Sequence, residues 1–213
     1  DPDTLDGEGS GDGASSGQGA TGEDGQDDDG QEGSPPTQEE LDAIEVPQWR
    51  LGDRWNFSAS EGRWSDYRVV GISQRGDIPT YQLAVRHGFG ASYTSQSLWI
   101  DQETLGTVAV SEGGVEATFG CPIGRLLPAT DDSWSCTYAG GTVEQARTVG
   151  SWATYQTDAG ERRGIQLHFE TDDGFRETQT FSWYAPSVGY RVAYVDDDGR
   201  TYTLRAWSWA AGP

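Results

Sequence analysis

The sequence predicts an all-β protein, either a strongly curved antiparallel sheet or a barrel of about ten strands, behind a disordered acidic tether. Three observations support this fold class. Apolar residues alternate with polar ones at a period of two, turn signals rich in Gly and Asp separate the alternating runs, and the composition changes abruptly near residue 46.

The first 45 residues differ in composition from the rest of the chain. They hold 15 of the 35 acidic residues and no arginine, and before Leu41 their only aliphatic side chain larger than alanine is Leu5. Such a segment cannot bury enough apolar surface to offset the entropy of ordering it. We therefore expect residues 1–45 to form a disordered linker, with at most one short helical turn at 37–46.

The carboxylates of this linker have two interpretations. They could form a calcium-binding array, or they could keep a spacer solvated and extended. The chain contains no Asp-x-Asp-x-Asp-Gly loop followed by a distal Glu, so the spacer is favoured.

Residues 46–213 are predicted to form a single all-β domain with an insertion near 111–136. This part holds all nine Trp, all nine Tyr, all six Phe and both Cys, and its 14 arginines against 20 acidic residues leave a net charge of −6. Its length is ordinary for one domain, and aromatic rings are expected to fill much of the core.

The alternation is clearest in three runs. In each run every second residue is apolar, which places those side chains on one face of a strand. These residues are Tyr81, Leu83 and Val85, then Ile165, Leu167 and Phe169, then Tyr190, Val192 and Tyr194. The turn signals Asp172-Asp173-Gly174 and Asp197-Asp198-Gly199 each lie between alternating runs, so each predicts a hairpin.

The segment Trp183-Tyr184-Ala185-Pro186 predicts a structural corner. Pro186 has no N–H to donate to a central ladder, so the strand must end near Ala185. Gly189 then permits the backbone to turn into the next strand.

Three segments carry a resemblance: WRLGDRWNFS at 49–58, CTYAGGTVEQARTV at 136–149 and TFSWYAPSVGYRVAYVDDDGRTYTLRAW at 180–207. They resemble secreted bacterial and archaeal proteins related to the DUF3108 (TapB-like) group. That group is similar in architecture to the LolA and LolB lipoprotein carriers, which have a strongly curved sheet around an apolar hollow. The resemblance implies this fold and a location in the cell envelope, and it implies no activity.

Cys121 and Cys136 lie 15 residues apart within the expected insertion. Two cysteines are too few to hold a metal ion. A catalytic thiol would need a base, and none lies near either cysteine in the sequence, although the fold could supply one. A disulfide is therefore the favoured interpretation for an exported protein.

Support for catalysis is thin, and we expect a non-enzymatic protein without a cofactor or metal. The alternative is a glycosidase, whose two catalytic carboxylates need only meet in space. His87 and His168 are interpreted as edge or surface residues, and no phosphate loop or Gly-x-Ser-x-Gly segment occurs. The net charge of −21 excludes a nucleic-acid binder that works through a basic patch.

Several large rings fall out of phase with the apolar face of their strands. Trp207 and Trp209 alternate with Leu204 and Ala206, and Trp152 is out of phase with its apolar neighbours. Either the N-terminal segment and the insertion cover these rings, or the rings line a concave ligand face with Arg205 at its rim.

Two functions follow from these observations. The first is an exported, surface-tethered β domain that binds an apolar, lipid-like ligand or a glycan at Trp152, Arg205, Trp207 and Trp209. The alternative is a structural or adhesive surface protein that packs against its own copies or another envelope protein. In both cases the chain is expected to lie outside the cell or in the cell envelope as a lipoprotein, anchored through its N-terminus.

Asn56 is the chain's single asparagine, and it begins Asn56-Phe57-Ser58. This segment fits the acceptor pattern for N-glycosylation in an exported protein. An unmodified asparagine on the outer face of a strand is the alternative.

Overall fold

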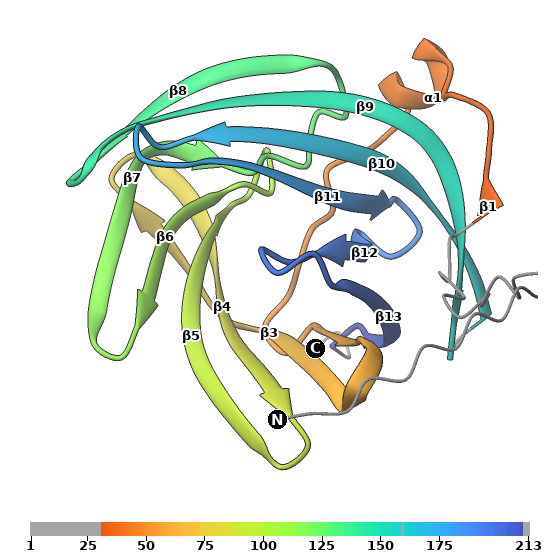
Figure 1. Ribbon diagram of the computed structural model, residues 1–213, viewed down its shortest axis with the longest axis horizontal. Helices are drawn as coiled ribbons and strands as arrows, with labels where there is room; N and C mark the ends of the chain where they lie inside the picture. Colours follow the sequence, from red (N-terminus) through yellow and green to blue (C-terminus); the bar gives the residue numbers. More distant parts are fainter. Residues whose placement is uncertain (1–30, 159, 211–213) are drawn as a thin grey trace, which may run out of the picture.

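The computed structural model describes residues 31–158 and 160–210, and these residues form almost entirely antiparallel strands (Figure 1). The predicted all-β class and its barrel form are confirmed. Residues 1–30 of the expected tether lie outside the described residues.

The described strands belong to one 13-stranded sheet, in which β2 to β13 close into a ring. The ring consists of β2 (Arg54–Ser58), β3 (Arg63–Arg75), β4 (Ile78–Phe89), β5 (Ser92–Asp101), β6 (Thr107–Glu112), β7 (Val115–Ile123), β8 (Asp132–Tyr138), β9 (Gly141–Thr157), β10 (Gly160–Asp172), β11 (Glu177–Ala185), β12 (Tyr190–Val195) and β13 (Thr201–Ser208).

One pairing closes the ring. Strand β13 pairs with β2, while each of the strands from β2 to β13 also pairs with its neighbours in sequence, including β8 with β9. The region expected to be an insertion therefore supplies β7 and most of β8, which are wall strands of the barrel. This is why the ring has more strands than the sequence predicted.

The core lies inside the ring and is built from aromatic and aliphatic side chains of the inner faces. Leu83, Val85, Ile165 and Leu167 have no exposed surface, as their alternation predicts. Both expected hairpins are present, as the turns between β10 and β11 and between β12 and β13.

The predicted corner is also present. Strand β11 ends at Ala185, and Gly189 has a φ of +64° immediately before β12. The backbone oxygen of Gly189 accepts a hydrogen bond from Trp49 Nε1 at 3.0 Å. The corner thereby fixes Trp49, whose ring contacts Trp55 and Tyr190 in the core.

The loop between β7 and β8 folds into the barrel, and we call residues 124–131 the inner loop. Its side chains Leu126, Leu127 and Ala129 belong to the buried core. The expected disulfide between Cys121 and Cys136 is confirmed and joins the two strands at the base of this loop.

A buried arginine holds the inner loop in place. Arg147 on β9 donates from Nε to the backbone oxygen of Thr130 at 2.8 Å and from Nη1 to that of Arg125 at 2.7 Å. Both ends of the inner loop are thereby tied to the barrel wall.

The segment before the barrel contains β1 (Gln31–Glu32) and α1 (Gln38–Asp42). The helical turn expected at 37–46 is present as α1, which begins with a capping box between Thr37 and Glu40. Leu41 and Ile44 pack against the core. Part of the expected linker therefore contacts the domain, and the boundary at residue 45 stays a prediction.

In the part of the chain that the structure describes, no helix is both long enough and apolar enough to cross a membrane.

Candidate functional site

The ring of Trp152 is enclosed, with 7% of its surface exposed. Its backbone N–H donates to the backbone oxygen of Ser34 in the N-terminal segment. The guanidinium of Arg163 lies 4.2 Å from the ring centroid and also approaches Glu40 of α1 at 3.7 Å. The N-terminal segment thus lies beside this ring, as one of the two interpretations expects.

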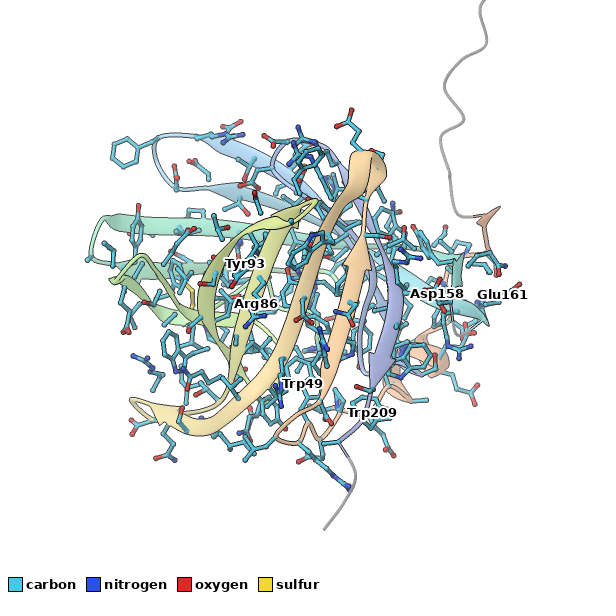
Figure 2. The ribbon with its side chains drawn as sticks, turned by 90° about the horizontal axis from the view of Figure 1, so that it is seen from below. Trp49, Arg86, Tyr93, Asp158, Glu161 and Trp209 are labelled. Carbon is cyan, nitrogen blue, oxygen red and sulfur yellow. A yellow bond between two sulfur atoms is a disulfide. The ribbon has the colours of Figure 1, made fainter. Side chains whose placement is uncertain are left out.

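Trp207 and Trp209 have different surroundings from each other. Trp207 is half-buried beneath the guanidinium of Arg162, which lies 4.7 Å from its ring centroid. Trp209 is 47% exposed and sets its ring edge-on to Trp55 at 6.0 Å. Figure 2 places Trp209 close to the described C-terminal end of the chain.

Arg205 is exposed on β13 and pairs with Asp158 in the turn between β9 and β10, with Nε and Oδ2 3.3 Å apart. It lines a hollow on the barrel surface that contains none of the three predicted rings. The structure therefore does not gather Trp152, Trp207 and Trp209 around Arg205.

The hollow beside Arg205 lies over the outer face of β2 and β3, and we call it the outer hollow. Its volume is about 400 Å³, and it is lined by Asn56, Phe57, Ser58, Ala59, Gly62, Arg63, Trp64, Ser65 and Arg205. Trp64 lies opposite Ser58 in the strand pairing, so both side chains occupy the outer face.

The indole of Trp64 is held in one orientation. Its Nε1 donates to the backbone oxygen of Gly90 at 3.0 Å, and its ring lies across Gly88 of β4, where any Cβ would clash with it. Glycine at position 88 is thus required for the ring to lie against the sheet.

A second ring continues this surface onto β5. Tyr93 is 56% exposed, and its ring centroid lies 6.2 Å from that of Trp64. Arg86 of β4 lies over the Tyr93 ring at 5.3 Å, and Figure 2 shows the two side chains side by side. Trp64, Arg86 and Tyr93 form what we call the aromatic platform.

Polar groups with planar side chains lie next to the aromatic platform. Asp66 accepts hydrogen bonds from Arg54 at 2.6 Å and from Asn56 Nδ2 at 2.7 Å. The outer face therefore combines two accessible rings with carboxylate, amide and guanidinium groups. N-glycosylation of Asn56 stays a prediction. The nitrogen that would carry the glycan, Nδ2, is the one that donates the hydrogen bond to Asp66.

Sequence reasoning did not select Trp64 or Tyr93. The available signal was the pairing of Trp64 with Gly88 across β3 and β4 and of Gly88 with Tyr93 across β4 and β5. That register cannot be read before the strands are aligned, because a shift of one residue exchanges the two faces.

The two histidines occupy different environments. His87 is partly buried, and burial lowers the pKa of its imidazole, whose Nε2 lies 3.0 Å from Nε2 of Gln96. His168 stacks on Phe181 with ring centroids 4.5 Å apart. Within residues 31–158 and 160–210, no group of three or more His, Cys, Asp or Glu side chains could hold a metal ion.

No protein-family model and no curated protein matches the chain. Two solved structures are similar to it. One is a Bacteroides fragilis protein, inferred to be exported and described as having a YmcC-like fold, with 11% identity, a TM-score of 0.40, and coverage of 75% of this chain and 97% of that one. The other is a Parabacteroides distasonis protein, inferred to be a lipoprotein, with 10% identity, a TM-score of 0.39, and coverage of 78% and 97%. Neither likeness is close enough to assign a family or a function to this chain.

Proposed function

We propose that this chain is an exported, non-enzymatic β-barrel that binds a carbohydrate on its outer face, across β2 to β5. The observation that carries the proposal is the fixed, partly exposed indole of Trp64 between the outer hollow and Tyr93.

The platform has the chemistry that sugar recognition needs. The C–H face of a pyranose packs against an aromatic ring, while its hydroxyls exchange hydrogen bonds with planar polar side chains. Arg205 and Asn56 line the outer hollow, and Arg86 lies beside Tyr93. Because the Trp64 ring is already held by Gly90, binding costs little additional side-chain ordering.

An acyl-chain ligand is less well supported. The rings expected to line an apolar groove offer little free surface, because Trp152 is enclosed and Trp207 is half-buried. The outer face offers accessible rings with polar neighbours, which suits a glycan better than a lipid tail.

The disulfide supports an extracytoplasmic location. Such bonds form and persist in secreted and envelope compartments, and reducing systems keep cytosolic thiols free. We propose that residues 1–30 tether the barrel to a membrane or cell surface, consistent with their like charge and small apolar content.

The test is binding of the full chain to an array of bacterial and plant oligosaccharides, followed by calorimetry with the strongest binder. We expect Trp64→Ala to weaken binding at least about fivefold, because stacking of a nucleic-acid base on one aromatic ring, a similar contact, is worth roughly 1–3 kcal/mol. Tyr93→Ala should weaken it less, since that ring lies at the end of the platform.

Trp209→Ala is the matched control, because Trp209 is also an accessible tryptophan but contacts Trp55 instead of the platform. Equal losses for Trp209→Ala and Trp64→Ala would assign binding to the region near the C-terminus. If the native protein binds none of the oligosaccharides on the array, the proposal is wrong.

Self-association remains the second candidate, because Tyr93 on the same face is 56% exposed. Pairing of strand edges has little support, since the ring from β2 to β13 is closed. Light scattering across a range of concentrations distinguishes the two functions. A dimer that Tyr93→Ser converts to monomer would favour association.

A further inference from the structure

Arg191 of β12 is a cation inside the barrel without a charged partner. It lies opposite Tyr184 in the strand pairing, and its guanidinium carbon is 5.5 Å from the Tyr190 ring centroid and 5.7 Å from that of Tyr194. Its Nε is fully enclosed and has no hydrogen-bond partner. Among the described residues, no carboxylate forms an ion pair with it.

Arg147 offers a comparison, because its guanidinium is more deeply buried than the partly buried Arg191 and keeps one enclosed nitrogen, Nη2, without a partner. Arg147 has 2% of its surface exposed, yet two of its nitrogens donate to the backbone oxygens of Arg125 and Thr130. Arg147 therefore has a structural role that explains its burial. Arg191 donates to no backbone oxygen in this way, although an enclosed nitrogen such as its Nε is unfavourable without a partner.

The tyrosines around Arg191 do not neutralise it. Burial raises the pKa of Tyr67 and Tyr190, and it raises the pKa of Tyr194 to about 12. All three hydroxyls are therefore uncharged at neutral pH. Their rings provide cation–π contacts but no negative charge.

Arg191 faces a hollow of about 200 Å³ at one end of the barrel, which we call the inner hollow. The hydroxyls of Thr180 and Ser182 on β11 line it, and in the described part of the chain neither has a side-chain hydrogen-bond partner. Gln145 lines it too, but its amide is already bonded to Gly124 and Thr171. The inner hollow thus offers free donors around one unpaired cation.

We propose that the inner hollow is an anion site in which Arg191 binds the carboxylate of a small organic acid. The terminal nitrogens of a guanidinium match the two oxygens of a carboxylate, and Thr180 and Ser182 would donate to the same group. Phe169 and Tyr194 supply apolar lining for the body of the ligand. This site lies among β9 to β12, whereas the aromatic platform lies on β3 to β5, and it is independent of the carbohydrate proposal.

The charge of the surroundings favours a singly charged ligand. Asp197, in the turn between β12 and β13, also lines the inner hollow, and the chain carries a net charge of −21. Both repel an incoming dianion more strongly than a monoanion. A carboxylate is therefore expected to bind more tightly than inorganic phosphate.

The experiment uses the full chain and follows titrations with acetate, propionate and benzoate by calorimetry, with inorganic phosphate and chloride as comparison anions. We expect saturable binding of at least one carboxylate, a loss of at least about tenfold in Arg191→Gln, and tighter binding in Asp197→Asn. An adventitious ion only, with equal binding by native protein and Arg191→Gln, would overturn the proposal. Phosphate binding more tightly than every carboxylate would also overturn it.

A stability measurement tests the same site without a ligand. In carboxylate-free buffer, Arg191→Met should raise the melting temperature, because it replaces an unpaired charge by an apolar side chain of similar length. The matched control Arg147→Met should lower it by leaving two carbonyls unpaired. A melting temperature of Arg191→Met at or below that of the native chain contradicts the claim that this cation is unpaired.

Discussion

At the scale of single residues, the structure depends on a few positions where a neighbour passes very close to the backbone. Gly88 is such a position, because the indole of Trp64 lies across it. Gly189 is another, because its positive φ turns the corner between β11 and β12 while Pro47 and Trp209 pack against it. Both glycines place aromatic side chains that the fold or the proposed site requires.

Gly189 gives a prediction with a matched control. A Cβ at position 189 would lie 3.0 Å from atoms of Pro47 and Trp209, whereas a Cβ at Gly199, with a similar φ of +77°, would meet nothing within 4 Å. Gly199→Ala should cost about 1 kcal/mol from backbone strain alone, and Gly189→Ala clearly more. Urea denaturation measures both. Equal costs would show that the packing around Gly189 yields without penalty.

The face of the strand on which a residue lies could not always be predicted from the sequence. Trp207 was expected on the face opposite Leu204, but a register shift between Leu204 and Ala206 sets Trp207 opposite the buried Trp55. A second shift in β9 lets both Val149 and Trp152 oppose inward residues of β10. Such bulges add one residue to a strand and exchange its faces, and the alternation of the sequence does not reveal them.

At the scale of elements, the inner loop and its disulfide act as one unit. The bond between Cys121 and Cys136 joins β7 to β8 just outside the loop that buries Leu126 and Leu127. The disulfide could be predicted from the cysteine spacing and the expected compartment. The burial of the inner loop in the barrel core could not be predicted, because no local pattern distinguishes a surface insertion from two wall strands and an inward loop.

Reduction of the disulfide should destabilise the barrel by roughly 3 kcal/mol, the chain-entropy value for a loop of about 15 residues. Chemical denaturation of native protein and the double variant Cys121→Ser, Cys136→Ser measures this difference. Two free thiols in unreduced, denatured protein would show that the bond is absent in solution.

The N-terminal segment is the second element with a testable role. Deleting residues 1–30 should leave the melting temperature unchanged, because this part contains almost no apolar surface. Deleting residues 1–45 also removes Leu41 and Ile44 from the core surface and the Ser34 contact from Trp152.

We expect the longer deletion to cost about 2 kcal/mol, or roughly 4–8 °C in melting temperature. Differential scanning calorimetry of the two truncations gives the comparison. Identical melting temperatures for both would mean that α1 does not contribute to the stability of the domain.

At the scale of the whole molecule, the charge and the rings are distributed unevenly. The first 45 residues carry −15 of the net −21, which leaves the barrel only mildly acidic. The two proposed sites differ in chemistry and in place, with the aromatic platform on the outer face of β3 to β5 and the Arg191 hollow among β9 to β12. This charge distribution is consistent with the proposed role of residues 1–30 as a tether.

The global architecture was accessible from sequence because it depends on period and turn chemistry. Alternation in β4, β10 and β12, with the Asp-Gly turns after β10 and β12, predicted a curved antiparallel sheet. The sites were less accessible because they depend on which strands meet when the ring closes. Arg205 is common to the predicted and the proposed carbohydrate site, whereas Trp64, Tyr93 and Arg191 became candidates only through their neighbours in space.

Hydrogen–deuterium exchange in the presence of the strongest oligosaccharide binder tests the central claim most directly, because it locates the ligand without any substitution. The account predicts added protection of backbone amides within residues 54–65 and 86–93, which form the platform and the outer hollow. Protection confined to residues 150–163 and 207–209, or no protection anywhere at saturating ligand, would contradict it.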